Sequence, residues 1–179
     1  MGIAGLTQRA FNGLNTIATA FIIVELLLAV IGGGSAIALY LAFTWMEHFR
    51  FALYALALLI GFGIGLEIPI LLRINQLWRR KLADNVGDVL ALDYVGALLG
   101  ALVWAFLLLP TFSLDRISLF LGLANLGAAV VTYILLRHLI RQRLLIGVVF
   151  VSAAGILGYL TFYGPQLIDD ARQHLYADP

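Results

Sequence analysis

Five long apolar stretches fill most of this 179-residue chain and limit what it can fold into. A helix needs about 20 apolar residues to cross the hydrocarbon core of a bilayer. In lipid every backbone polar group must be hydrogen-bonded within the protein, which favours helices. We therefore predict an all-α fold, a polytopic integral membrane bundle of about five transmembrane helices. The predicted spans are Ile17–Thr44, Phe49–Arg73, Val89–Leu109, Leu114–Leu136 and Leu144–Tyr163.

The composition supports this class and argues against several functions. Only 12% of the residues are charged, against about 25% in ordinary soluble domains. The net charge of +1 provides no basic excess for nucleic acid, and the absence of cysteine excludes disulfides and thiolate metal sites. The three histidines, His48, His138 and His174, do not have metal-ligand spacing. We predict no metal, no cofactor, no nucleic-acid partner and no catalytic residue in this chain.

The basic residues predict an orientation in the membrane. Residues 1–163 form the predicted transmembrane bundle, and residues 164–179 form a polar tail that starts at Gly164-Pro165. Lysine and arginine are enriched on the cytoplasmic side of membrane proteins. With five spans, the N-terminal side holds Arg9, Arg73, Arg79, Arg80, Lys81, Arg137, Arg141 and Arg143, and the other side holds Arg50, Arg116 and Arg172. We predict a multi-pass protein of the cell (inner) membrane that starts inside and ends outside.

Three acidic residues, Glu25, Glu67 and Asp93, lie inside the predicted spans. A charged group at a helix centre costs about 2.5–3.5 kcal/mol on insertion scales, so such groups usually face protein or water. At 1.5 Å per residue, the three acids lie about 12, 9 and 7–8 Å from the same side of the membrane. Two interpretations stay open. Each carboxyl group bonds a neighbouring helix, or the three acids and Tyr94 form a ligand-binding or ion-binding site.

Glycines in the second and third spans predict close helix packing. Gly61, Gly63 and Gly65 lie in the middle of a span and not after a strand, which argues against a nucleotide-binding loop. Gly96 and Gly100 form a GxxxG pair, which lets another helix approach closely. This pair shares a helix face with Asp93.

The first and fourth spans contain two further polar or small-residue features. The run Gly32–Ser35 either breaks the first span into two half-helices, as in transporters, or forms a packing groove. Asn125 lies in the middle of the fourth span, and we predict that it bridges helices and does not bind a ligand.

Several stretches together resemble one family. They are FIIVELLLAVIGGGSA (21–36), GIGLEIPILLR (63–73), LALDYVGALLGALVWAFLLLP (90–110), LGLANLGAAV (121–130) and QHLYADP (173–179). They are similar to the membrane domain of membrane-bound spermidine synthase-like proteins, polyamine aminopropyltransferases with an N-terminal transmembrane region. The resemblance implies two further spans before residues 21–36 and a soluble catalytic domain after residue 179. We therefore expect a shortened chain, inactive alone, whose polar tail corresponds to the linker. The resemblance also implies a cytoplasmic catalytic domain, which conflicts with the orientation predicted from the charges.

Three functions fit these features. The first is the membrane domain of a spermidine synthase-like aminopropyltransferase, which anchors the enzyme and binds or passes polyamines. Its partners would be the bilayer, a polyamine and a soluble aminopropyltransferase domain. The second is an independent transporter or channel for protons or small cations, with the buried carboxylates as a relay. The third is a purely structural anchor that forms homo-oligomers through its glycine faces.

Overall fold

The computed structural model describes residues 14–76, 82–138, 140 and 142–177, and these residues are almost all helical. The all-α prediction is confirmed for the described chain, which contains no strand. The helices are α2 (Leu14–Trp45), α3 (Phe49–Asn75), α4 (Leu82–Val103), the π-helical segment η2 (Trp104–Leu108), α5 (Leu109–Thr111), α6 (Leu114–Leu136) and α7 (Arg143–Ala177). Five helical stretches are long and apolar enough to cross a membrane, by length and composition.

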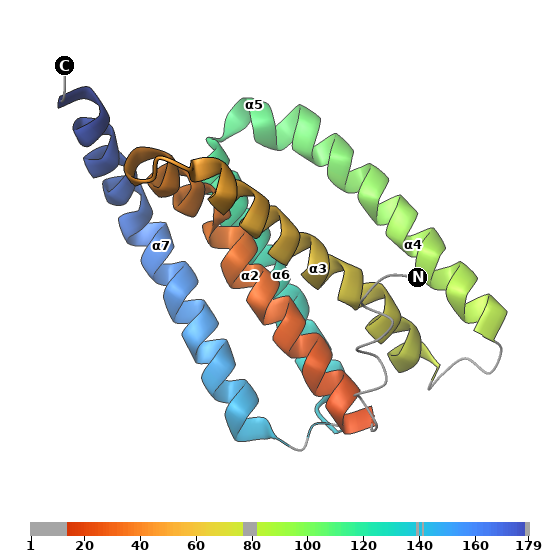
Figure 1. Cartoon of the computed structure of the whole chain (residues 1–179). Coiled ribbons are helices and arrows are strands. Elements are labelled where there is room, and N and C mark those ends of the chain that lie inside the picture. Colours follow the sequence, from red (N-terminus) through yellow and green to blue (C-terminus); the bar gives the residue numbers. More distant parts are fainter. Residues whose placement is uncertain (1–13, 77–81, 139, 141, 178–179) are drawn as a thin grey trace.

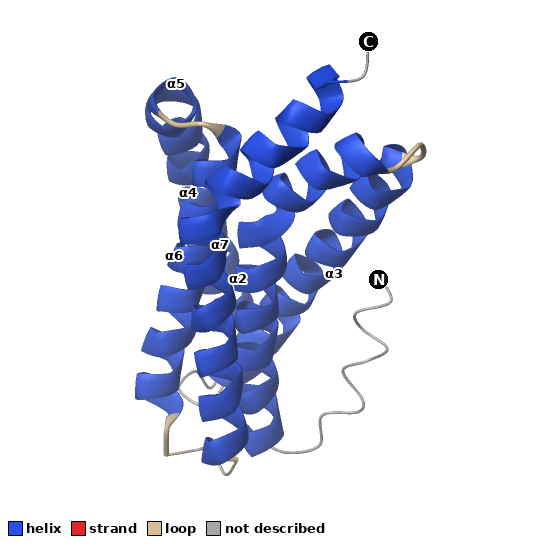
Figure 2. Ribbon diagram, turned by 90° about the vertical axis from the view of Figure 1, so that its left-hand side faces the viewer, coloured by secondary structure: helices blue, strands red, loops and turns tan. Residues whose placement is uncertain are grey.

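Helix α2 is the centre of the fold and packs against α3, α6 and α7 (Figures 1 and 2). Its sequence is apolar on every side, as expected for a helix surrounded by others. Ile22 and Leu26 of α2 are almost fully buried and join a core cluster with Ile146 and Ala153 of α7. A second cluster nearer the end of α2 combines Ala29 and Ile37 with residues of α6 and α7.

Close contact between α2 and α6 depends on two glycines. A Cβ added at Gly122 would lie 2.6 Å from the carbonyl oxygen of Ala29 and 2.7 Å from the Cα of Gly33. One turn earlier in α6, the Ser118 hydroxyl donates a hydrogen bond of 3.0 Å to the carbonyl of Gly33. Small residues allow helix backbones to approach and a hydroxyl to bond across the interface. The groove interpretation of Gly32–Ser35 therefore holds, and the half-helix interpretation is wrong because α2 is continuous.

The predicted end of the fifth span at Tyr163 is also wrong, because α7 continues through Gly164-Pro165 to Ala177. Proline removes one backbone donor within a helix, but packing holds the helix on both sides of it. A Cβ at Gly164 would lie 2.7 Å from Ile37, so this glycine is a helix contact and not a helix end. Beyond Pro165, Ile168 packs on the second core cluster and Ala171 is buried.

Helix α4 lies beside α3, at the side of the bundle away from α7 (Figure 1). It begins at Leu82, seven residues before the predicted start of the third span, and all residues from Ala91 to Leu107 are exposed. Pro110 cannot donate to the carbonyl four residues before it. The helix adapts just ahead of the proline, where the Leu109 N–H donates to the carbonyl of Trp104 and forms a π-helical turn. Such turns are frequent at functional sites.

Candidate functional site

The three predicted acidic residues come from three neighbouring helices, Glu25 from α2, Glu67 from α3 and Asp93 from α4. Consecutive helices are antiparallel, so depth is counted from Leu14, Asn75 and Leu82 at one end of the bundle (Figure 1). The acids then lie about 16, 12 and 16 Å from that end. The values exceed the estimates from sequence because α2 and α4 start earlier, and α3 ends later, than predicted. All three acids occupy the same half of the bundle.

Electrostatic repulsion links the three acids in pairs. Glu25 is close enough to Glu67 to be affected by its charge, and Glu67 is affected in the same way by Asp93. Glu25 is buried, with 8% of its surface exposed, Glu67 is half-buried and Asp93 is exposed. Glu67 is thus the middle member of a row that runs from the core to the surface of α4. Within the described ranges, no three acidic or histidine side chains lie close enough together to hold a metal ion.

The structure does not bring Tyr94 into this row. Tyr94 is 70% exposed and follows Asp93 on a helix that leaves its whole middle uncovered. Successive residues in a helix point about 100° apart, so the Tyr94 side chain does not point in the same direction as that of Asp93. Its predicted role in binding remains untested.

Of the five glycines predicted to pack, the structure brings only Gly63 against a neighbour. A Cβ at Gly63 would lie 2.7 Å from the side chain of Leu28 on α2. For the other four, Gly61, Gly65, Gly96 and Gly100, an added Cβ would meet no atom of the described residues within 4 Å. Gly96 and Gly100 are uncovered because of the position of α4. This helix packs against α3 near its own start, where Val89 is buried, and leaves the GxxxG face exposed.

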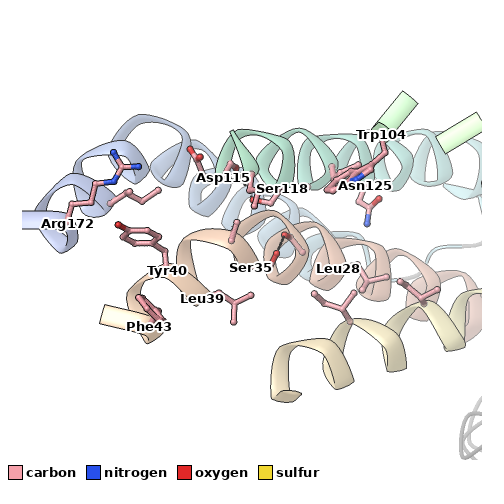
Figure 3. A pocket seen from close by; sticks show the side chains of 18 residues that line it. Leu28, Ser35, Leu39, Tyr40, Phe43, Trp104, Asp115, Ser118, Asn125 and Arg172 are labelled. Atoms are coloured by element: carbon pink, nitrogen blue, oxygen red, sulfur yellow. Dashed lines mark hydrogen bonds between the residues drawn. The ribbon is translucent and has the colours of Figure 1, made fainter. Parts of the chain in front are cut away.

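A second feature of the described structure is a cavity that begins about one helical turn from Glu25 and Glu67 and extends toward the other end of the bundle. It has a volume of about 730 Å³ and lies between α2, α3, η2, α6 and the end of α7 (Figure 3). Most of its wall is apolar, with Leu28, Leu39, Ile60, Ile64 and Leu121 among the lining residues. Its polar groups include Tyr40, Asp115, Asn125 and Arg172. A cavity of this size with apolar walls and few polar groups is typical of a small-molecule site.

Sequence reasoning missed this cavity. Asn125 was predicted to bridge helices, but no interhelical hydrogen bond of its side chain is seen among the described residues, and it faces the cavity instead (Figure 3). Asp115 and Arg172 are 57 residues apart in the sequence, where Asp115 lies at the start of a predicted span and Arg172 lies in the predicted polar tail. Only the extension of α7 past Pro165 brings Arg172 to the cavity.

The sequence is similar to proteins named polyamine aminopropyltransferase. "Polyamine aminopropyltransferase 1" of Streptomyces coelicolor is 38% identical over 185 residues, which cover the whole of this chain. "Polyamine aminopropyltransferase" of Mycobacterium tuberculosis is 41% identical over 172 residues, or 90% of this chain, and that of Corynebacterium efficiens is 36% identical over the whole chain. These homologues support the family resemblance.

The match covers only part of each relative. The chain spans about one third of their length, between 33% and 36% in these three proteins. No family model matches the sequence, and no solved structure does. What the complete relatives do therefore reaches this chain only as a proposal.

Proposed function

We propose that this chain is the membrane-embedded part of a polyamine aminopropyltransferase-type protein in the inner cell membrane, where it anchors the enzyme and binds a polyamine. The observation that carries the proposal is the similarity along the whole chain to proteins of that name. Five apolar helices long enough to cross a bilayer support the anchoring role.

The row Glu25–Glu67–Asp93 supports the binding role. A polyamine carries several positive charges spaced along a flexible chain, so it needs carboxylates in sequence and not in one tight cluster. Carboxylates that lie within the hydrocarbon layer are expensive unless an opposite charge is present, and attraction between charges is stronger there than in water. A bound polyammonium ion would weaken the repulsion of Glu67 by Glu25 and by Asp93.

Titration calorimetry tests the binding role on the full chain in lipid nanodiscs. Spermidine should give measurable binding heat with the wild type and much less with the double variant Glu67→Gln/Asp93→Asn. The matched control is Glu47→Gln/Asp169→Asn, which removes two exposed acids outside the row and should bind like the wild type. Equal heats for wild type and the Glu67/Asp93 double variant would remove polyamine binding from the proposal.

A flux assay separates this function from transport. Liposomes that contain the purified chain should show no proton or cation flux that depends on Glu67. If Glu67→Gln abolishes a flux, an independent transporter replaces the binding role. If the acid variants change only the free energy of unfolding, the purely structural anchor is the remaining function.

A further inference from the structure

The cavity between α2, η2, α6 and α7 has opposite charges at one end and apolar walls at the other. Asp115 and Arg172 lie toward the same end of the cavity, with Tyr40 and Phe43 across from them (Figure 3). Leu28 and Asn125 lie toward the opposite end, with Trp104 on the side of α4. A ligand that fits this arrangement has a head with both charge signs and a long apolar body.

The charged end lies at the end of the bundle. Asp115 is the second residue of α6, and Phe43 is two residues from the end of α2. In a membrane protein such positions lie near the headgroups, where charged groups of a lipid are found. Asn125 is ten residues further along α6, about 15 Å deeper. This depth equals about half of the 30 Å hydrocarbon core, which is the depth of one leaflet.

Each part of the charged end suits a different part of a zwitterionic head. Arginine recognises phosphate through several donors held in one plane. An ammonium group is attracted by a carboxylate and by the faces of aromatic rings such as those of Tyr40 and Phe43. Asp115 also lies in the first turn of α6, where the helix dipole stabilises its negative charge. The site thus has one negative and one positive side chain at the level of the headgroups, and its wall is mostly apolar deeper in the bundle.

One aromatic side chain next to α4 also belongs to the apolar part. Trp104, the first residue of the π-helical turn η2, lines the cavity and is partly exposed. Ile60 and Ile64 of α3 and Leu121 of α6 form further apolar wall.

We propose that this cavity is a lipid site for an amine-headed glycerophospholipid, with the phosphate beside Arg172, the ammonium group beside Asp115 and Tyr40, and one acyl chain along the apolar wall. The charged end of this site is remote from the row of acids, none of which lines the cavity, and the proposal does not depend on polyamine binding.

Lipid retention tests the proposal on the full chain. The protein is purified in detergent, mixed with equal amounts of phosphatidylethanolamine and phosphatidylglycerol, and the bound lipids are identified by native mass spectrometry. The wild type should retain phosphatidylethanolamine in preference. Asp115→Asn should lower that preference by about tenfold, because a hydrogen bond to a charged group is lost. The matched control Asp170→Asn removes an exposed acid that does not line the cavity and should retain lipid like the wild type.

A second pair of variants tests the location. A Cβ at Gly32 meets no atom within 4 Å, and Gly32 lines the cavity, so Gly32→Leu fills the space without a clash at its Cβ. It should abolish retention of both lipids. Gly155→Leu, on the exposed side of α7 with equally open space, is its control. Circular dichroism must show the same helix content in both variants.

Several results would overturn the proposal. Equal retention of the two lipids, or no effect of Asp115→Asn, would remove the recognition of the amine. Unchanged retention in a folded Gly32→Leu protein would place the lipid elsewhere. Displacement by soluble phosphoethanolamine at the same concentration would show that the head alone is the ligand. Glu67→Gln should leave lipid retention unchanged, so a failure of polyamine binding can be distinguished from a failure of lipid binding.

Discussion

Helices α2 and α4 are both long and apolar, but they meet the rest of the chain in opposite ways. In α2, the backbone of Gly33 lies directly against Gly122 of α6. In α4, Gly96 and Gly100 form the sequence pattern expected for such a contact, yet neither has a neighbour at its Cβ position in the part of the chain that the structure describes. A glycine in an apolar helix thus marks a helix contact only where the fold places another helix against it. The sharpest tests of this difference compare the same substitution in the two regions.

The largest expected effect is that of Gly122→Ala. Its added methyl group would lie within 3 Å of backbone atoms of α2, which cannot move aside without separating the two helices. We expect a loss of about 3 kcal/mol in the free energy of unfolding, at the upper end of typical overpacking costs. Gly100→Ala meets no atom and should be neutral or up to about 1 kcal/mol more stable, because alanine favours helix. Unfolding by denaturing detergent in mixed micelles measures both.

Equal effects of these two substitutions would contradict the comparison. A large loss from Gly100→Ala in particular would mean that the exposed face of α4 has a partner outside this chain. Analytical ultracentrifugation of the two proteins would then distinguish a homo-oligomer from a purely local change in the helix.

A smaller effect is expected at Ser118, whose single hydroxyl proton has two acceptors, the carbonyl of Gly33 across the interface at 3.0 Å and that of Asp115 in its own helix at 2.9 Å. Ser118→Ala should cost about 1 kcal/mol, within the range measured for hydrogen bonds between membrane helices. Thr161→Ala is the comparison, because its hydroxyl bonds the Leu157 carbonyl of its own helix at 2.7 Å. That bond adds no contact between helices, so its loss should have little effect. The same micelle titration compares them, and a greater loss from Thr161→Ala would contradict the role of Ser118.

Much of the helical fold could be predicted from the sequence, because span length and composition depend on local residues. The start of α3 at Phe49 and the bounds of α6 at Leu114 and Leu136 agree with the predicted spans. The errors lie where tertiary contacts override local signals. Gly164-Pro165 is typical of a helix end, but contact with Ile37 and the burial of Ala171 keep α7 helical.

The row of acids and the cavity also differ in how far they could be predicted from local sequence. The row of acids could be predicted because a carboxylate in an apolar stretch stands out, and counting residues from the helix ends gives its depth. The cavity could not be predicted, because its walls come from segments as distant as Leu28 and Arg172, and each lining residue is ordinary in its own segment. Its volume depends on how far the helices stay apart, which no single stretch of sequence determines.

The smallest expected effect concerns Glu67, the acid that two other acids repel. Repulsion between carboxylates is strongest at alkaline pH, where Glu67→Gln should raise the free energy of unfolding by about 0.5–1 kcal/mol. This gain should become smaller as the pH is lowered. Glu47→Gln, an exposed acid between α2 and α3, should show no such pH dependence. Thermal unfolding at several pH values measures the difference. A gain of the same size in acid would mean that glutamine improves packing, and a loss at alkaline pH would mean that Glu67 accepts a hydrogen bond or a cation that outweighs the repulsion.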